Sequence, residues 1–281
     1  MLKSTTVLAA LLVGTLSSPL TAQTASSSGY TVGVDETVTV PRVANVNVTV
    51  GPVAPASGNA PAPYDNTTTI VSLNENAALT GGLFGVGQNL QTSVLTTNAN
   101  GTATGAEATS TVNNFMLSIA GLSNLLSISA TTIESSSQAN SVGGLDASGT
   151  TTIEGLNLGG TLLGSLLLDS SLFVNPNPNT VLLNLGGLSI ILNEQTMLGD
   201  GVNSLGIETN ALRIGFDNFL LGTGVVNGDI IVGNSQAFAT VTHPGTGAVP
   251  EPATWAMMLL GFGLAGFAIR RSRAQAVLQV A

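Results

Sequence analysis

Apolar and small polar residues alternate along most of the middle of the chain, and this period of two constrains the fold more than any other feature. Successive side chains of a strand point to opposite faces, so alternation predicts strands with one buried face. Gly-Gly, Asp-Gly and Asn-Pro pairs interrupt the runs and favour turns. The alternating sets are Phe115, Leu117 and Ile119; Leu126, Ile128 and Ala130; Val181, Leu183 and Leu185; Leu188, Ile190 and Leu192; and Leu205, Ile207 and Thr209.

Long helices are not expected in this region, because charged residues make up only 7% of the chain and helix-favouring Lys, Arg, Glu and Gln are too few to cover solvent faces. We therefore predict an all-β domain over residues 67–241, built as an antiparallel sandwich. A β-solenoid is the alternative, since the segments GLSNLL, GLNLGG and GLSIIL begin at residues 121, 155 and 187 and are almost equally spaced.

Prolines concentrate on the N-terminal side of this domain. Residues 23–66 hold five of the eleven prolines, which predicts an extended linker, with one strand where Val46, Val48 and Val50 alternate with polar residues. Residues 242–249 form a second short linker.

The first 22 residues have the pattern of a secretory signal peptide. Lys3 precedes an apolar stretch from Val7 to Leu16, and small residues lead to a cleavage site after Ala22. The secretion machinery and a signal peptidase are therefore expected partners.

A second apolar segment lies near the C-terminal end. Ala253 to Ile269 carries no charge and would span about 26 Å as a helix, just enough for a single transmembrane helix. Trp255 is expected at one membrane interface. The basic cluster Arg270, Arg271 and Arg273 is expected on the cytoplasmic side, followed by residues 274–281 as a cytoplasmic tail.

Gly261, Gly263 and Gly266 match the G-x-G-x-x-G nucleotide fingerprint by letter. That fingerprint belongs in a turn between a strand and a helix, with an acidic residue about 20 positions later. No Asp or Glu follows Glu251, so these glycines are better explained as small residues of a membrane helix, and no cofactor is expected.

Pro250, Glu251 and Pro252 stand directly before the apolar segment, where two prolines enforce an extended backbone. The order Val-Pro-Glu-Pro-Ala-Thr-Trp, apolar helix and arginine cluster over residues 249–273 closely resembles the PEP-CTERM sorting signal of Gram-negative bacteria. The resemblance implies recognition of Pro250, Glu251 and Pro252 by an exosortase, which cleaves near them.

The central region also resembles a family. The segments AGLSNLLSISATTIESSSQA, TTTIEGLNLGG and LLNLGGLSIILNEQT are similar to the choice-of-anchor P family over residues 66–241. That resemblance implies an extracellular region and supplies no enzymatic activity.

The net charge of the chain, its lack of cysteine and its single histidine argue against several functions. Residues 23–249 hold 14 acidic residues and two arginines, a net charge of about −12, which argues against nucleic acid as a partner. The chain has no Cys, and its single histidine, His243, falls in the second linker. GDG at 199–201 and NGD at 227–229 are predicted to be turns and not calcium loops. We therefore assign no catalytic residue and no metal ligand.

The combined prediction is a non-enzymatic protein of a Gram-negative bacterium. It is exported across the inner membrane, held there transiently, and then placed at the cell surface or in the extracellular matrix, with a structural or adhesive role linked to exopolysaccharide and biofilm. One alternative is an exported polysaccharide-active enzyme that uses carboxylates among Glu134, Glu154, Glu194 and Glu208. Another is a periplasmic binding protein that keeps its membrane anchor.

Overall fold

The computed structural model describes residues 24–42, 44–78, 87–120, 123–161, 163, 173–222, 224–241, 257–264, 267 and 270. The chain divides into two compact units, Met1–Val241 and Thr242–Ala281. The segments predicted to be a signal peptide, residues 1–22, and a second linker, residues 242–249, lie outside the described residues.

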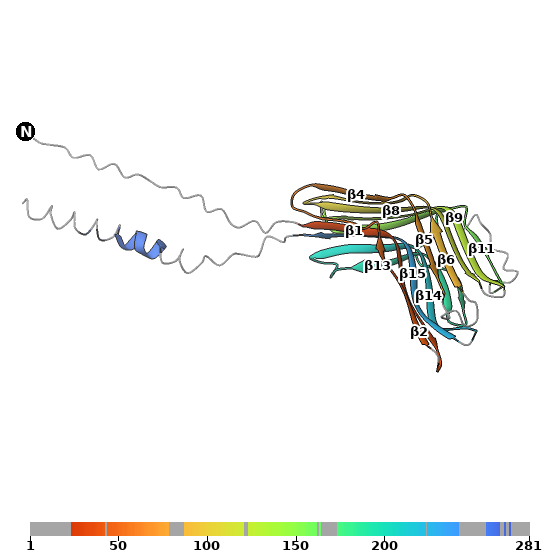
Figure 1. Cartoon of the computed structure of the whole chain (residues 1–281). Coiled ribbons are helices and arrows are strands. Elements are labelled where there is room, and N and C mark those ends of the chain that lie inside the picture. The colour runs from red at the N-terminus through yellow and green to blue at the C-terminus, as the bar shows by residue number, and fades with distance from the viewer. Residues whose placement is uncertain are drawn as a thin grey trace, which may run out of the picture. The chain divides into compact units, whose positions relative to one another are not determined.

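The first unit contains two antiparallel sheets (Figure 1). The seven-stranded sheet has the order β12 (Thr180–Leu185), β13 (Leu188–Leu198), β14 (Ser204–Leu221), β15 (Gly224–Thr240), β1 (Ala25–Val40) and β2 (Ala44–Val53), and β3 (Ala56–Asn59) also pairs with β1. Within this sheet the first strand of the unit, β1, pairs with the last strand, β15.

The eight-stranded sheet is built around β8 (Gly105–Ala120) and β9 (Asn124–Asn140). The strands β10 (Asp146–Glu154) and β11 (Asn157–Gly159) pair with β9, β6 (Gly87–Thr92) and β7 (Leu95–Thr102) pair with β8, β5 (Leu73–Ala77) pairs with β6, and β4 (Tyr64–Ile70) pairs with β7. The long strand β8 therefore changes partner along its length.

The two sheets share one apolar core, which confirms the all-β, antiparallel part of the prediction. Val34 of β1 and Ile214 of β14 belong to the same buried cluster as Phe115 of β8 and Ile133 of β9. Burying these side chains between two layers removes apolar surface from water at roughly 25 cal/mol per Å². The solenoid alternative finds no support, because Gly155 and Gly187 each mark a turn before an antiparallel strand.

Alternate residues of the long strands face the interior, and in the middle of β1 and β14 this alternation shifts by one position. Thr31 and Val32 are both fully buried on β1, and Ala211 and Leu212 are both fully buried on β14. Gly233, in register with this row, has a φ of 68°. A left-handed residue inside a strand interrupts the pleat and bends it, and the strands of this sheet curve in Figure 1.

The bend separates two kinds of interior. On one side the core is made of Leu, Ile, Val and Phe. On the other side it consists of small residues, namely Ala25, Ala60, Ala106, Ala139, Ala237 and Ala239. There the Ser137 hydroxyl of β9 donates to the backbone carbonyl of Ser235 at 2.9 Å, so the two backbones approach closely.

The prediction that residues 23–66 form an extended linker is wrong, although the one strand expected there, at Val46, Val48 and Val50, is part of β2. β1 pairs with β15 from Ala25↔Ala239 to Thr39↔Val225 and with β2 on its other side. Ser, Thr and Gly fill many of its inward positions, so its apolar alternation is weak. The prolines are compatible with strands because Pro41, Pro55, Pro61 and Pro63 lie between strands, and Pro52 ends the edge strand β2.

In the second unit, residues 257–264 are helical. Of the helices in the described residues, none has the length and apolar character needed to cross a membrane. Within the segment 253–269, where we predicted a transmembrane helix, the described residues 257–264 and 267 are helical. Gly261 and Gly263 lie within this helix and not in a strand-to-helix turn, which agrees with rejecting the nucleotide fingerprint.

Candidate functional site

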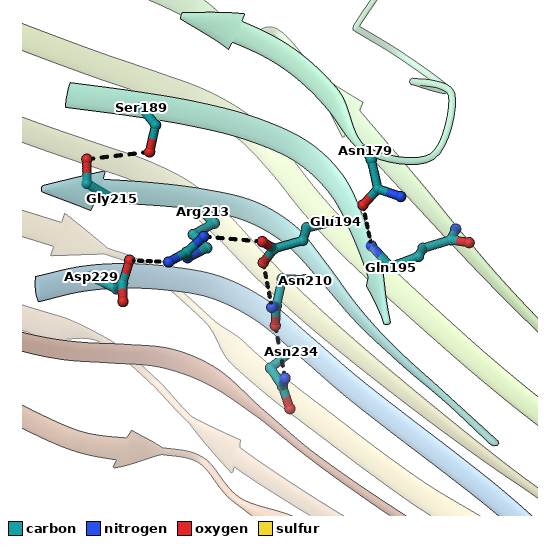
Figure 2. A network of polar contacts seen from close by, with 9 residues as sticks. All are labelled: Asn179, Ser189, Glu194, Gln195, Asn210, Arg213, Gly215, Asp229 and Asn234. Atoms are coloured by element: carbon teal, nitrogen blue, oxygen red, sulfur yellow. Dashed lines mark hydrogen bonds and ion pairs between the residues drawn. The ribbon is translucent and has the colours of Figure 1, made fainter. Parts of the chain in front are cut away.

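The most extensive polar network lies on the outer face of the seven-stranded sheet. Strand register places Glu194 of β13 opposite Asn210 of β14, and Asn210 opposite Asn234 of β15. Thr209 directly precedes Asn210, and Ser235 directly follows Asn234. Both are fully buried and face the other sheet, so the two asparagines point to the opposite face. We call Glu194, Glu208, Asn210, Arg213, Asp229 and Asn234 the polar band, and Figure 2 shows all of them except Glu208.

The two asparagines connect two glutamates. Asn210 Nδ2 donates to Glu194 Oε2 at 3.0 Å, and Asn234 Nδ2 donates to Asn210 Oδ1 at 2.8 Å. Asn234 Nδ2 also donates to Glu208 Oε1 at 2.8 Å. Both asparagines are almost fully buried by their neighbours, so these bonds satisfy amides that would otherwise be costly to bury.

Arg213 holds one end of the band. Its guanidinium contacts Glu194 Oε1 at 3.1 Å and Asp229 Oδ1 at 2.7 Å (Figure 2). One cation against Glu194, Asp229 and Glu208 leaves the band negative by two charges. The Arg213 side chain is about one-third exposed, so each ion pair contributes on the order of 0.2–1 kcal/mol to stability.

Tyr30 of β1 borders the band, since it lies opposite Asn234 in the β1–β15 pairing. Burial, followed by the negative charges of Glu208 and Asp229, raises the pKa of Tyr30 to about 12. The phenol is protonated at neutral pH, as an unperturbed tyrosine also is, so it can donate a hydrogen bond. Its ring lies over Gly33, where an added Cβ would be 3.0 Å from Tyr30 Cε2.

The structure brings together only two of the four glutamates considered for glycan hydrolysis. Glu194 and Glu208 share the band, whereas Glu134 and Glu154 lie on β9 and β10 of the other sheet. Both oxygens of Glu194 are already hydrogen-bonded, to Arg213 and Asn210. The geometry thus resembles a recognition surface of amides and carboxylates more than a pair of free carboxyl groups poised for proton transfer.

Sequence reasoning missed Tyr30, Arg213, Asn210 and Asn234. Tyr30 fell within the expected linker, and the two asparagines become neighbours of the glutamates only through cross-strand register. The one available signal was Arg213 itself, an isolated arginine in a region with a large excess of acidic residues.

The two glycine–aspartate segments have different structures. Asp200 closes the β13–β14 connection, where its carboxylate accepts hydrogen bonds from the backbone N–H groups of Val202, Asn203 and Ser204. The Asn203 side chain and these backbone donors hold the pKa of Asp200 well below its usual range. GDG is therefore a turn, as predicted.

NGD at 227–229 is not a turn, contrary to the prediction. These residues lie inside β15, opposite a bulge of β14 between Phe216 and Phe219. Gly228 has a φ of 127° and packs against the backbone of Asp35 and Glu36. The absence of a side chain at this position lets β15 approach β1 closely.

In the described part of the chain, no three or more His, Cys, Asp and Glu side chains are grouped so that they could hold a metal ion. Ala22, His243, Pro250, Glu251, Pro252, Trp255, Arg271 and Arg273 lie outside the described residues, as does the tail 274–281. Arg270 is described, and it is helical and exposed.

Comparison with protein-family models matches residues 248–273 to the PEP-CTERM protein-sorting motif. No curated protein and no solved structure matches the chain. The similarity of residues 66–241 to the choice-of-anchor P family stays a prediction. The C-terminal segment of this chain carries the PEP-CTERM sorting motif, which indicates an exported protein that an exosortase sorts.

Proposed function

We propose that this chain is an exported β-rich surface protein that an exosortase cleaves near Pro250, Glu251 and Pro252. The match of residues 248–273 to the sorting motif carries the proposal. In this scheme a signal peptide ending at Ala22 directs export, and the C-terminal apolar segment holds the protein transiently at the inner membrane of a Gram-negative bacterium. Cleavage then delivers the body to the cell surface or the extracellular matrix.

The ends of the β body support this scheme. Thr24 N–H donates to Thr240 Oγ1 at 3.1 Å, and Thr240 N–H donates to the Thr24 carbonyl at 2.9 Å. The chain therefore enters and leaves the body through neighbouring strands at one end of the β1–β15 pair. Removal of segments before residue 24 and after residue 241 leaves all strand pairing of the body intact.

The sorting step is tested by replacing Glu251 and Pro252 with Ala in cells that contain the exosortase. We expect the wild-type mature protein to end near Pro250–Pro252 and the variant to keep its C-terminal segment, as seen by mass spectrometry of the intact protein. Pro244→Ala is the matched control, because it removes a nearby proline outside the motif. A wild-type mature protein that retains residues 253–281 would defeat the proposal.

We further propose a structural or adhesive role, in which the outer face of the seven-stranded sheet contacts exopolysaccharide in a biofilm. The polar band offers amide donors, carboxylate acceptors and the Tyr30 hydroxyl, which are the groups that pair with sugar hydroxyls. Its negative charge suits a neutral or cation-bridged glycan better than an acidic one.

A polysaccharide-active enzyme is the second candidate, favoured by the approach of Glu194 and Glu208 through two asparagines. The two roles separate when Glu194→Gln and Glu208→Gln are compared with wild type on a glycan panel, with Glu134→Gln on the other sheet as control. Hydrolysis by wild type that either band variant abolishes would establish the enzyme. Glycan binding without product would support adhesion. If the wild type shows neither binding nor product, the polar band serves neither role.

A further inference from the structure

A second group of polar side chains lies between the two sheets, whereas the polar band lies on the outer face of one of them. Glu36 belongs to β1 of the seven-stranded sheet, and Glu75 and Gln88 belong to β5 and β6 of the eight-stranded sheet. Glu36 stands between the buried Val34 and Val38 on the inward face of its strand. Gln88 shares the buried face of β6 with Leu90.

Glu36 and Gln88 are buried and Glu75 is half-buried, and five of the six polar side-chain atoms of these residues have no hydrogen-bond partner. Glu36 and Gln88 are each 1% exposed. Both carboxylate oxygens of Glu36, both polar atoms of the Gln88 amide and one oxygen of Glu75 make no hydrogen bond. Buried polar groups are nearly always hydrogen-bonded, because a buried group that lacks a partner loses its hydrogen bonds to water without replacing them, and the cost is larger for a charged group. So many unpaired atoms at one place indicate a site for a ligand that they surround.

The amide of Gln88 lies in the middle of this group. It is close enough to both carboxyl groups to lower the pKa of each, although no atom pair meets the geometry of a hydrogen bond. Gln88 is not acidic, and its unpaired amide is a second observation, independent of the two carboxylates, that points to a ligand.

Within the described residues, no ion pair neutralises the two carboxylates. In the part of the chain that the structure describes, the ion pairs all involve Arg213, which is engaged with Glu194 and Asp229. The nearby Asp229 adds a further negative charge. Burial, then repulsion from Glu75 and finally Asp229, raises the pKa of Glu36 against the lowering effect of Gln88.

We propose that Glu36, Glu75 and Gln88 bind a divalent cation, Ca²⁺, between the two sheets. The two carboxylates and the amide oxygen are the hard oxygen ligands that Ca²⁺ prefers, and water completes its shell of six to eight. Two negative charges against a doubly positive ion leave the buried site neutral. The ion joins β1 to the β5–β6 pair, so it stabilises the contact between the sheets at this edge.

Thermal unfolding of the full chain in mild detergent at pH 8 tests this site after treatment with EDTA. We expect Ca²⁺ at a hundredfold excess over its Kd to raise the Tm by about 5–10 °C in wild type. Glu36→Gln should abolish the rise, while Glu134→Gln, an exposed glutamate on β9, should keep it. Mg²⁺ should act more weakly, because it demands a tighter octahedral shell.

Glu36→Gln is nearly isosteric and removes a buried charge, so the Tm of this variant in EDTA should equal or exceed that of wild type. A loss of the Ca²⁺ response in this variant therefore does not result from misfolding. Titration calorimetry should give one ion per wild-type chain. The proposal is overturned if wild type shows no Tm rise and no heat of binding, which would leave a carboxyl pair that shares a proton. It is also overturned if Glu36→Gln responds as wild type does.

Discussion

At the scale of the residue, a single buried carboxyl links the stability of this protein to pH. The pKa of Glu36 is about 8 in the folded protein, against 4.5 for an unperturbed glutamate, chiefly because of burial. The folded state therefore binds more protons than the unfolded state between these two values. Its contribution to stability is complete below pH 4.5 and is lost as the pH rises toward 8.

We predict that the free energy of unfolding in EDTA falls by up to about 5 kcal/mol between pH 4.5 and pH 8 through this one group. Glu36→Gln should flatten this part of the profile and raise stability at pH 8. Urea unfolding at a series of pH values measures both effects. If the free energies of unfolding of the variant and the wild type change in parallel across this pH range, Glu36 is not the cause of the pH dependence.

At the scale of the element, a left-handed glycine lies where the inward-facing side of β15 switches between alternate residues. Gly233 has a φ of 68°, and a Cβ there would lie 3.1 Å from the Ala211 Cβ and 3.6 Å from the Ile133 Cγ2. Without this conformation, the same alternate residues of β15 would face one side of the sheet along the whole strand. Either Val232 or Ser235 would then leave the interior.

Gly233→Ala should therefore destabilise the protein by about 1–3 kcal/mol, from backbone strain and crowding together. Gly51→Ala on the edge strand β2 is the control, because no atom lies within 4 Å of a Cβ at that position and its φ is not left-handed. Chemical denaturation compares the two. Equal, small effects of both substitutions would show that the bend does not need Gly233.

At the scale of the whole molecule, the body is one unit whose first and last strands pair. β1 lies between β15 and β2, so residues 25–40 are internal to the sheet and not an appendage. Its pairing with β15 joins residues more than 200 positions apart, such as Ala25 and Ala239. Contacts of this kind form late and slowly in folding.

Deletion of residues 24–66 should abolish the cooperative fold, because it exposes the edge of β15 and removes buried residues such as Val32, Val34 and Val38. Deletion of 242–281 should leave the circular dichroism spectrum and Tm of the body unchanged. A folded, monomeric protein that lacks residues 24–66 would instead restore the linker interpretation.

Sequence patterns predicted much of the strand content but not its boundaries. The alternating sets at 115–119, 126–130 and 188–192 all fall in strands with the expected residues inside. β1 was missed because its inward residues include Ser27, Gly29 and Thr31, which alternate in size and not in polarity. The polar band was half predicted: its glutamates were candidates, whereas Tyr30 and the asparagines were not.

The sequence by itself determined the strand-forming character of the chain and its C-terminal sorting motif, because alternation, turn residues and an extended Pro-Glu-Pro are local properties. Only the tertiary structure decided that β1 closes onto β15, that Glu194 meets Glu208 through two asparagines, and that Glu36 faces Glu75 and Gln88. Such neighbours depend on register between distant strands, and a shift by one residue would turn each of these side chains to the opposite face.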